Sequence, residues 1–230
     1  MFASDLFCNN RLINGEAYRN IVSLRNLKNI FSELSDDPFD NAVAVQAELE
    51  THKSIEPKFA YNTAITYPFI AKPYLDNRFG DGSYGVWYGS MDLNTTIFET
   101  CYHIYKAIIS VQDYPAVVKH ERSVFTVCCE GVLIDLSDKV KKHPDLVSDD
   151  YSFCQMIGKK LHKEGHPGIL YASARTNGLN LAIFTPKILR NPKNYCFLTY
   201  VFSTRDKVVR VENEAAEELL NIDTCKSFGL

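Results

Sequence analysis

Five short runs rich in β-branched and aromatic residues dominate the chain beyond residue 84, and they constrain its fold most. Runs of this kind, bounded by turn-forming residues, are typical of β-strands. Only two helical patterns interrupt them, and helices do not alternate strictly with strands. The pattern therefore favours an α+β fold, with a twisted β core and flanking helices, over a doubly wound parallel sheet. The expected strands cover residues 84–90, 123–136, 168–172, 179–185 and 195–203.

The two helices among these strands have recognisable starts and stops. The first is expected to begin after Asp92, a good N-cap residue, and its buried face should carry Ile97, Cys101, Ile104, Tyr105 and Ile108. The second follows the acidic pair at positions 149 and 150 and ends at Gly165.

Residues 1–58 are expected to form a helical extension packed on the remaining domain, residues 59–230. Apolar residues recur at three- and four-residue steps from Ile21 to Leu34, which is the period of an amphipathic helix. A second helix is expected over residues 41–52. Prolines at positions 57, 68 and 73 are expected to exclude regular helix from the segment that follows.

Charge and composition exclude several classes of protein. The formal charge is -3, with 25 basic and 28 acidic residues, which gives no electrostatic reason to expect direct nucleic-acid or membrane-surface binding. No apolar run approaches the roughly 20 residues needed to cross a bilayer. The N-terminus carries Asp5 where a signal peptide needs positive charge. We therefore expect a cytoplasmic protein without membrane contact.

Cysteine and histidine spacing gives no reason to expect a metal. The seven cysteines show no Cys-x-x-Cys spacing, which fits neither a disulfide framework nor a structural zinc site. His162 and His166 lie four residues apart, but Gly165 ends the helix between them and no third ligand is evident. We predict no metal site.

A glycine-rich segment precedes the first strand. Gly80, Gly82 and Gly85 match the G-x-G-x-x-G pattern of dinucleotide-binding folds. That pattern requires a helix directly after it, whereas a strand-like segment follows here, and no acidic residue stands where it would bind the ribose. The glycines are better explained by a tight turn between Arg78 and the strand.

Two later segments carry polar residues whose spacing alone has an ordinary explanation. Glu99 and His103 lie one helical turn apart on one face, but charged residues on a helix face are usually just solvated. Ser173 and Asn180 flank a polar loop, and residues of these types also simply form turns.

Taken in order, these segments resemble the RES domain family, named for an arginine, a glutamate and a serine. The resemblance extends roughly from residue 68 to residue 184, and the order and spacing of its pieces carry it more than any single piece. Those pieces are RFG at 78–80, VWYG at 86–89, TIFETCYH at 96–103, YASAR at 171–175 and NLAIF at 180–184.

The resemblance implies an active site at Arg78, Tyr88, Glu99 and Ser173, on a fold similar to that of ADP-ribosyltransferases. Residues 59–230 would be the catalytic domain. The implied substrate is NAD, cleaved between nicotinamide and ribose with no further cofactor. Many members are toxins of toxin–antitoxin pairs, which makes an Xre-type helix-turn-helix antitoxin a candidate partner.

The residue types suit this reaction. Nicotinamide leaves NAD as a neutral base, so the difficult step is the positive charge that develops on the ribose, which the Glu99 carboxylate would stabilise. The planar fork of Arg78 would place the dinucleotide through paired hydrogen bonds. Tyr88 or its neighbour Trp87 would stack on the cationic pyridinium.

Ser173 and Asn180 are expected to orient the substrate by hydrogen bonds. Ser173 is not expected to be a nucleophile, because no Ser-His-acid arrangement accompanies it. Water, inorganic phosphate or a protein could accept the ADP-ribosyl group, and the sequence does not choose among them.

One departure from the family pattern stands at Ile70. Related sequences often read Pro-Phe-Arg-Tyr ahead of the arginine motif, whereas this chain has Pro68-Phe69-Ile70-Ala71. If the missing arginine binds a substrate phosphate, either Lys72 substitutes for it or affinity is reduced. An inactive NAD-binding module is therefore an alternative to an enzyme.

Overall fold

The computed structural model describes residues 5–23, 61–113 and 115–230. Eight strands form one sheet in the order β1-β4-β7-β6-β5-β8-β9-β10. Their bounds are β1 Asn10–Val22, β4 Trp87–Ser90, β5 Val117–Asp135, β6 Gly168–Ala172, β7 Leu179–Ile183, β8 Leu189–Ser203, β9 Val208–Glu212 and β10 Glu218–Asp223. A separate two-stranded hairpin joins β2 (Asp76–Asn77) to β3 (Gly80–Asp81).

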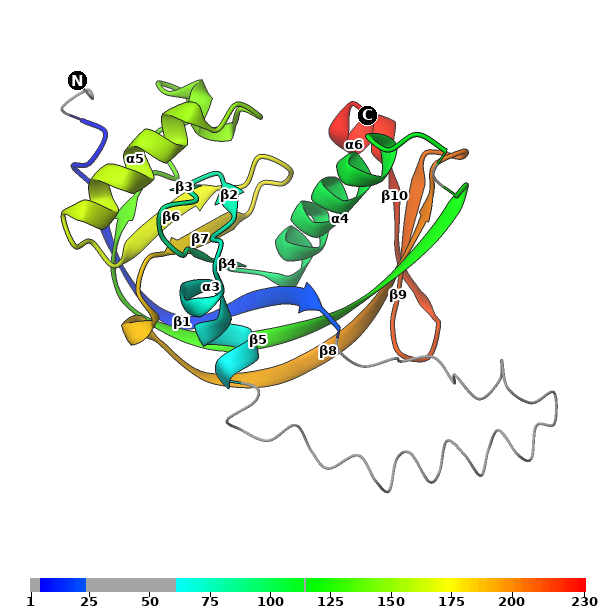
Figure 1. Cartoon of the computed structure of the whole chain (residues 1–230), viewed down its shortest axis with the longest axis horizontal. Coiled ribbons are helices and arrows are strands. Elements are labelled where there is room, and N and C mark those ends of the chain that lie inside the picture. The colour runs from blue at the N-terminus through cyan, green and yellow to red at the C-terminus, as the bar shows by residue number, and fades with distance from the viewer. Residues whose placement is uncertain (1–4, 24–60, 114) are drawn as a thin grey trace.

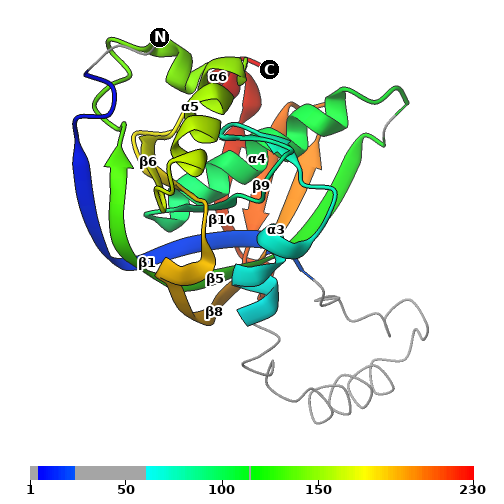
Figure 2. The same cartoon turned by 60° about the vertical axis from the view of Figure 1, so that its left-hand side comes forward.

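Helices cover this sheet and link its strands. The long ones are α4 (Leu93–Ile109) and α5 (Ser152–Lys163), which lie on the same side of the layer formed by β1, β5 and β8 (Figures 1 and 2). The shorter ones are a π-helical turn (Asn62–Thr66), α3 (Tyr67–Ile70), 3-10 turns (Pro144–Val147 and Pro186–Ile188) and α6 (Thr224–Phe228).

Five strands close into a ring. Strand β1 pairs along its whole length with β5 and also meets β4 at Tyr18 and Ser90, while β4 pairs with β7, β7 with β6, and β6 with β5. Every strand of the ring contributes to one buried apolar cluster, so this cluster fills the space that the ring encloses. Its members include Ile13, Ala17, Trp87, Phe125, Leu133, Leu170, Leu181 and Ile183.

Two further clusters attach the helices to the sheet. Helix α5 packs Cys154, Ile157 and Leu161 against the outer face of β6 and β7. Helix α4 packs against β8, β9 and β10 through four buried residues of the predicted face, namely Ile97, Cys101, Tyr105 and Ile108. Ile104, also expected on that face, is only partly buried.

The α+β class, with a twisted β core and flanking helices, is confirmed. All five predicted strands are present, although β4 begins later than expected, at Trp87, and β5 and β8 begin earlier. Asp92 caps α4 by accepting a hydrogen bond from the backbone nitrogen of Thr95 at 2.7 Å. The chain leaves α5 through Gly165 with a positive φ of 81°.

The helix predicted from Ile21 is wrong at its start, because Ile21 and Val22 belong to β1. The backbone of β1 pairs with β5, a partner about a hundred residues away, and such a partner overrides a local helical period. The remainder of that predicted helix and the one over residues 41–52 lie outside the described residues. The division of the chain at residue 58 stays a prediction.

The expectation that Pro68 excludes helix is also wrong. Pro68 lies in the first turn of α3, where a missing backbone N–H costs nothing because it would have no partner in the helix. Three C-terminal elements, β9, β10 and α6, were not expected at all. Within the described ranges, no helix is both long and apolar enough to cross a membrane.

Helix α5 fixes the β2–β3 hairpin, which carries Arg78. A Cβ atom at Gly158 would lie 2.0 Å from the carbonyl oxygen of Phe79, so only glycine permits this approach. Lys159 Nζ binds Asp81 Oδ2 at 2.7 Å, and Gln155 Nε2 donates to the carbonyl of Asn77 at 3.1 Å. The position of Arg78 therefore depends on close packing against α5.

We expect Gly158→Ala to destabilise the fold by about 1–3 kcal/mol, because the added methyl group meets backbone that cannot move aside cheaply. The higher helix propensity of alanine would by itself stabilise the fold by about 1 kcal/mol. The sign of the change in the free energy of unfolding therefore shows whether the steric clash dominates. Thermal or denaturant unfolding measures it. Gly15→Ala is the matched control, since a Cβ there meets nothing within 4 Å. An unchanged or raised stability of Gly158→Ala would contradict the packing described.

Candidate active site

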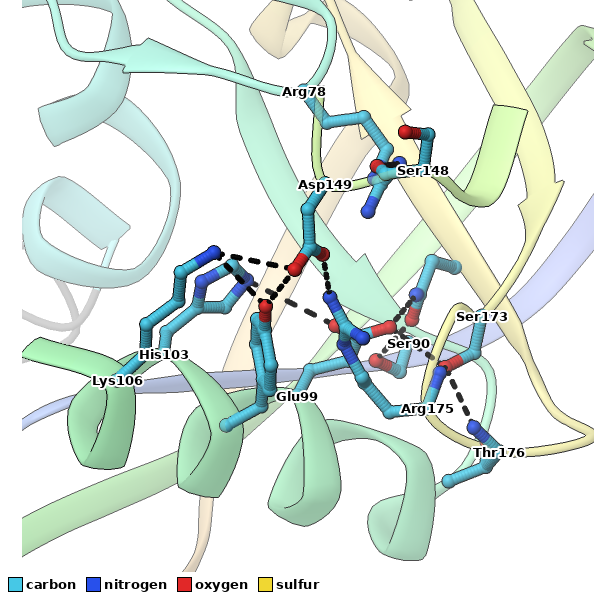
Figure 3. A network of polar contacts seen from close by, with 12 residues as sticks. Arg78, Ser90, Glu99, His103, Lys106, Ser148, Asp149, Ser173, Arg175 and Thr176 are labelled. Carbon is cyan, nitrogen blue, oxygen red and sulfur yellow. Dashed lines mark hydrogen bonds and ion pairs between the residues drawn. The ribbon is translucent and has the colours of Figure 1, made fainter. Parts of the chain in front are cut away.

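Glu99, on α4, lies at the centre of a polar network that also includes the loop after β6 and the outer face of β7 (Figure 3). Its Oε1 accepts hydrogen bonds from Ser173 Oγ and from Asn180 Nδ2, each at 2.7 Å. Its Oε2 lies 3.9 Å from Nε2 of His103. The structure thus brings together the glutamate, the serine and the asparagine that the sequence singled out.

Strand register orients the amide of Asn180. Residue 180 in β7 lies opposite Ser90 in β4, and Ser90 Oγ donates to Asn180 Oδ1 at 2.7 Å. The amide nitrogen must then face Glu99. Because Ser90 and Asn180 are both buried, these bonds are sheltered from water and fix the rotamer of the carboxylate.

The loop after β6 orients Ser173 in the same way. Ser173 Oγ accepts from the backbone nitrogens of Arg175 and Thr176 at 3.0 and 3.1 Å. Its single proton is therefore left to donate to Glu99. Close packing holds the loop against α4, since a Cβ at Gly178 would lie 1.9 Å from Thr95 Oγ1.

Arg78 lies in the same region, but most of its contacts are with other groups of the protein. Its Nη1 donates to the carbonyls of Leu146 and Ser148 at 3.0 and 2.8 Å, and its guanidinium lies 4.7 Å from the centre of the Tyr151 ring. Its side chain also hydrogen-bonds Cys154, an interaction that lowers the pKa of that thiol against the larger effect of burial. Arg78 thus holds the segment before Asp149.

The two aromatic candidates face opposite sides of β4. Trp87 has no exposed surface, lies in the cluster inside the ring and donates from Nε1 to the carbonyl of Ala64 at 2.7 Å. Tyr88 packs on the outer face, where its hydroxyl donates to Asn77 Oδ1 at 2.6 Å and accepts from the nitrogen of Phe79 at 2.8 Å. The structure therefore brings Tyr88 beside the Arg78 hairpin, and it does not bring Trp87 to the site.

A second cluster, centred on Asp149, adjoins Glu99 and was missed by sequence reasoning. Asp149 accepts hydrogen bonds from Tyr102, Lys106 and Arg175 (Figure 3). Arg175 also stacks on Tyr102, with its guanidinium carbon 3.3 Å from the ring centre. Burial alone would raise the pKa of Asp149, but the bonds from Tyr102 and Arg175 hold it well below the usual range.

No local sequence pattern could have predicted all the members of the Asp149 cluster. Arg175 stands in a segment that carries the family resemblance, but Asp149 reads only as a residue before a helix. Their pairing joins two loops 26 residues apart.

His103 completes the rim of the site. Partial burial, together with the positive charges of Arg175, Arg78 and Lys106, lowers its pKa below the ordinary value, and this outweighs the opposite effect of Glu99. These surroundings disfavour the charged form of the imidazole.

A model of the RES domain matches residues 48–203 of the sequence. The chain belongs to the RES domain family. No curated protein matches its sequence. Among solved structures, a chain of the M. tuberculosis MbcT–MbcA toxin–antitoxin complex is similar, with a TM-score of 0.42 and 12% identity, covering 80% of this chain and 86% of the other.

Among the residues that the structure describes, no group of three or more His, Cys, Asp or Glu side chains is placed to bind a metal ion. His162, considered above as a ligand, stacks face to face on Tyr84 with ring centres 4.0 Å apart, and His166 lies beside Glu164. The Glu99 network is accordingly the best candidate site of this RES domain.

Asn180→Asp tests this network through its pH dependence. The change puts a second carboxylate beside Oε1 of Glu99, and two such groups share a proton, so their apparent pKa rises in the folded state. The folded variant then holds more protons than the unfolded one, and its stability falls as pH rises from about 4 to about 7, by about 1.4 kcal/mol per unit of raised pKa.

Denaturant unfolding across that pH range measures the effect, with Asn180→Leu as the uncharged control. The control loses the same hydrogen bonds without adding a charge. Parallel stability profiles for the two variants would show that Asn180 does not adjoin the Glu99 carboxylate.

Proposed function

We propose that this protein cleaves NAD between nicotinamide and ribose, with Glu99 as the residue that stabilises the developing positive charge. The observation that carries this proposal is the fixed carboxylate: Oε1 is held by Ser173 and Asn180 at 2.7 Å each, and the Glu99 side chain remains one-fifth exposed. A preorganised charge of this kind acts on the transition state without reorganising during the reaction. The activity implied by the family resemblance is consistent with it.

The chemistry needs few groups. The pyridinium leaves as neutral nicotinamide, so no proton has to be delivered to the leaving group. As the bond to the ribose breaks, the sugar acquires oxocarbenium character, which an adjacent carboxylate stabilises more than it stabilises the ground state. Water or inorganic phosphate then adds to the ribose carbon, which makes the protein a glycohydrolase or a phosphorylase.

In this proposal, residues on the outer face of β4 and on the neighbouring β2–β3 hairpin position the substrate. Of the two rings considered for the nicotinamide, Tyr88 is the one on this face, and its neutral phenol is fixed by two hydrogen bonds. Burial raises the pKa of that phenol well above its ordinary value. Arg78, on the same hairpin, would contribute positive charge to substrate placement.

The proposed biological role is that of a toxin in a toxin–antitoxin pair, in which an Xre-type helix-turn-helix protein would neutralise the enzyme. Family resemblance supports this role. The charge and composition of the chain favour action in the cytoplasm, where NAD is available.

Nicotinamide release from NAD tests the activity. We expect Glu99→Gln to lower the rate on the order of 10²- to 10³-fold, because the variant keeps the shape of the side chain and loses its charge. Chromatography of reactions with and without phosphate measures release and identifies the acceptor. Glu164→Gln, which changes an exposed glutamate at the end of α5, is the matched control.

The other outcomes are equally informative. Radiolabel from NAD appearing on a protein would identify an ADP-ribosyltransferase. Binding of NAD without turnover at enzyme concentrations near the substrate's would identify an inactive module, for which Ile70, exposed at the end of α3, is the motivating departure. Absence of both binding and release would refute the proposal.

Expression of the protein tests the toxin role separately. We expect induction to arrest bacterial growth and to lower cellular NAD, and Glu99→Gln to abolish both effects because the carboxylate charge is needed for cleavage. Growth curves and NAD assays on the same cultures measure them. Arrest with intact NAD would count against NAD loss as the cause of toxicity.

A further inference from the structure

Arg175 is a firmly held cation beside Glu99 that the chemistry above leaves unused. Its backbone nitrogen donates to Ser173 Oγ, and that hydroxyl donates to Glu99. Its guanidinium stacks on Tyr102 and pairs with Asp149 through Nη2. Both ends of the residue are therefore fixed relative to the proposed catalytic carboxylate.

We propose that Arg175 binds the pyrophosphate of the substrate and that Asp149 and Tyr102 hold its guanidinium in place for this purpose. The inference rests on the proposed cleavage of NAD and adds a substrate-binding residue to it.

The hydrogen bonds of Arg175 are incomplete within the protein. Of the guanidinium nitrogens, Nη2 is engaged by Asp149, whereas neither Nε nor Nη1 has an acceptor in the described part of the chain. The side chain is only 12% exposed. An unsatisfied donor on a nearly buried charge is costly, and phosphate oxygens are the acceptors that match a guanidinium fork.

The charge of the surroundings is complementary to NAD. Arg78, Lys106 and Arg175 contribute positive charge, Glu99 and Asp149 contribute negative charge, and the nearby Asp150 is exposed and bound to Ser152. Counting the first five groups, the site carries one net positive charge. NAD carries two phosphate charges and one pyridinium charge, which leaves one net negative charge on the ligand.

Arg78 and Arg175 have different tasks in this arrangement. Nη1 of Arg78 donates hydrogen bonds to the carbonyls of Leu146 and Ser148, just before Asp149 in the chain. It thereby positions the segment whose carboxylate holds Arg175. Lys106, the other cation of the cluster, is half exposed, and a flexible ammonium lacks the fork that grips two phosphate oxygens.

The stack on Tyr102 prepares Arg175 for binding. A guanidinium flat on an aromatic ring gains cation–π energy and loses rotational freedom before the ligand arrives. Less conformational entropy is then lost on binding. A residue that only supported the loop would not need a fork with two unengaged nitrogens.

The test compares NAD with nicotinamide riboside, which has the same scissile bond and no phosphate. We expect Arg175→Gln to raise KM for NAD about 10- to 100-fold, the effect of losing charge-assisted hydrogen bonds, and to leave kcat/KM for the riboside unchanged. Arg175→Lys keeps the charge and should show a smaller loss on NAD only. Arg190→Gln, which removes a surface arginine paired with Glu130, is the matched control.

Equal losses on the two substrates, or none on either, would overturn the assignment of Arg175. Where the wild-type protein does not cleave the riboside, or cleaves neither substrate, calorimetric titration with ADP-ribose decides. Binding that weakens at least about tenfold in Arg175→Gln but not in Arg190→Gln supports the anion site even if cleavage of NAD is wrong. No binding by the wild-type protein, or equal binding by Arg175→Gln, overturns the inference.

Discussion

Strand β5 hydrogen-bonds along both of its edges, and the rest of the molecule depends on this. One edge pairs with β1 and the other with β8 and, near its end, with β6. The first pairing closes the ring that encloses the interior cluster, and the second extends the sheet beneath α4. Because Trp87 and Leu181 fill the ring from inside, their neighbours Tyr88 and Asn180 are turned outward, to the face where the candidate site lies.

The candidate site uses three elements that lie apart in sequence. Helix α4 supplies Glu99, the loop after β6 supplies Ser173, and β7 supplies Asn180. Each polar atom in the group has a defined donor or acceptor role, since the two backbone bonds to Ser173 and the bond from Ser90 to Asn180 leave one arrangement of protons. The hydrogen bonds around Oε1 of Glu99 therefore make this part of the site rigid, which suits the proposed role of Glu99 in stabilising charge without moving.

Charged side chains around Glu99 hold one another in place. Asp149 keeps Arg175 in place, and Arg78 keeps the segment that carries Asp149 in place. Two of the cations near Glu99, Arg78 and Arg175, are therefore held in fixed positions. A negative centre inside a positive rim is complementary in charge to the proposed substrate NAD, which is an anion with a positively charged ring.

The sequence by itself determined most of the local elements and selected the main residues of the candidate site. Strand periodicity, the Asp92 cap and the turn at Gly165 depend on neighbours in the chain, and the ordered motifs selected Glu99, Ser173, Asn180 and Arg78. Tertiary structure alone decided that Ile21 and Val22 join a strand, that Trp87 faces inward while Tyr88 faces outward, and that Asp149 meets Arg175. Strand partners, buried faces and ion pairs of this kind join residues far apart in the chain, so they depend on packing that local propensity does not encode.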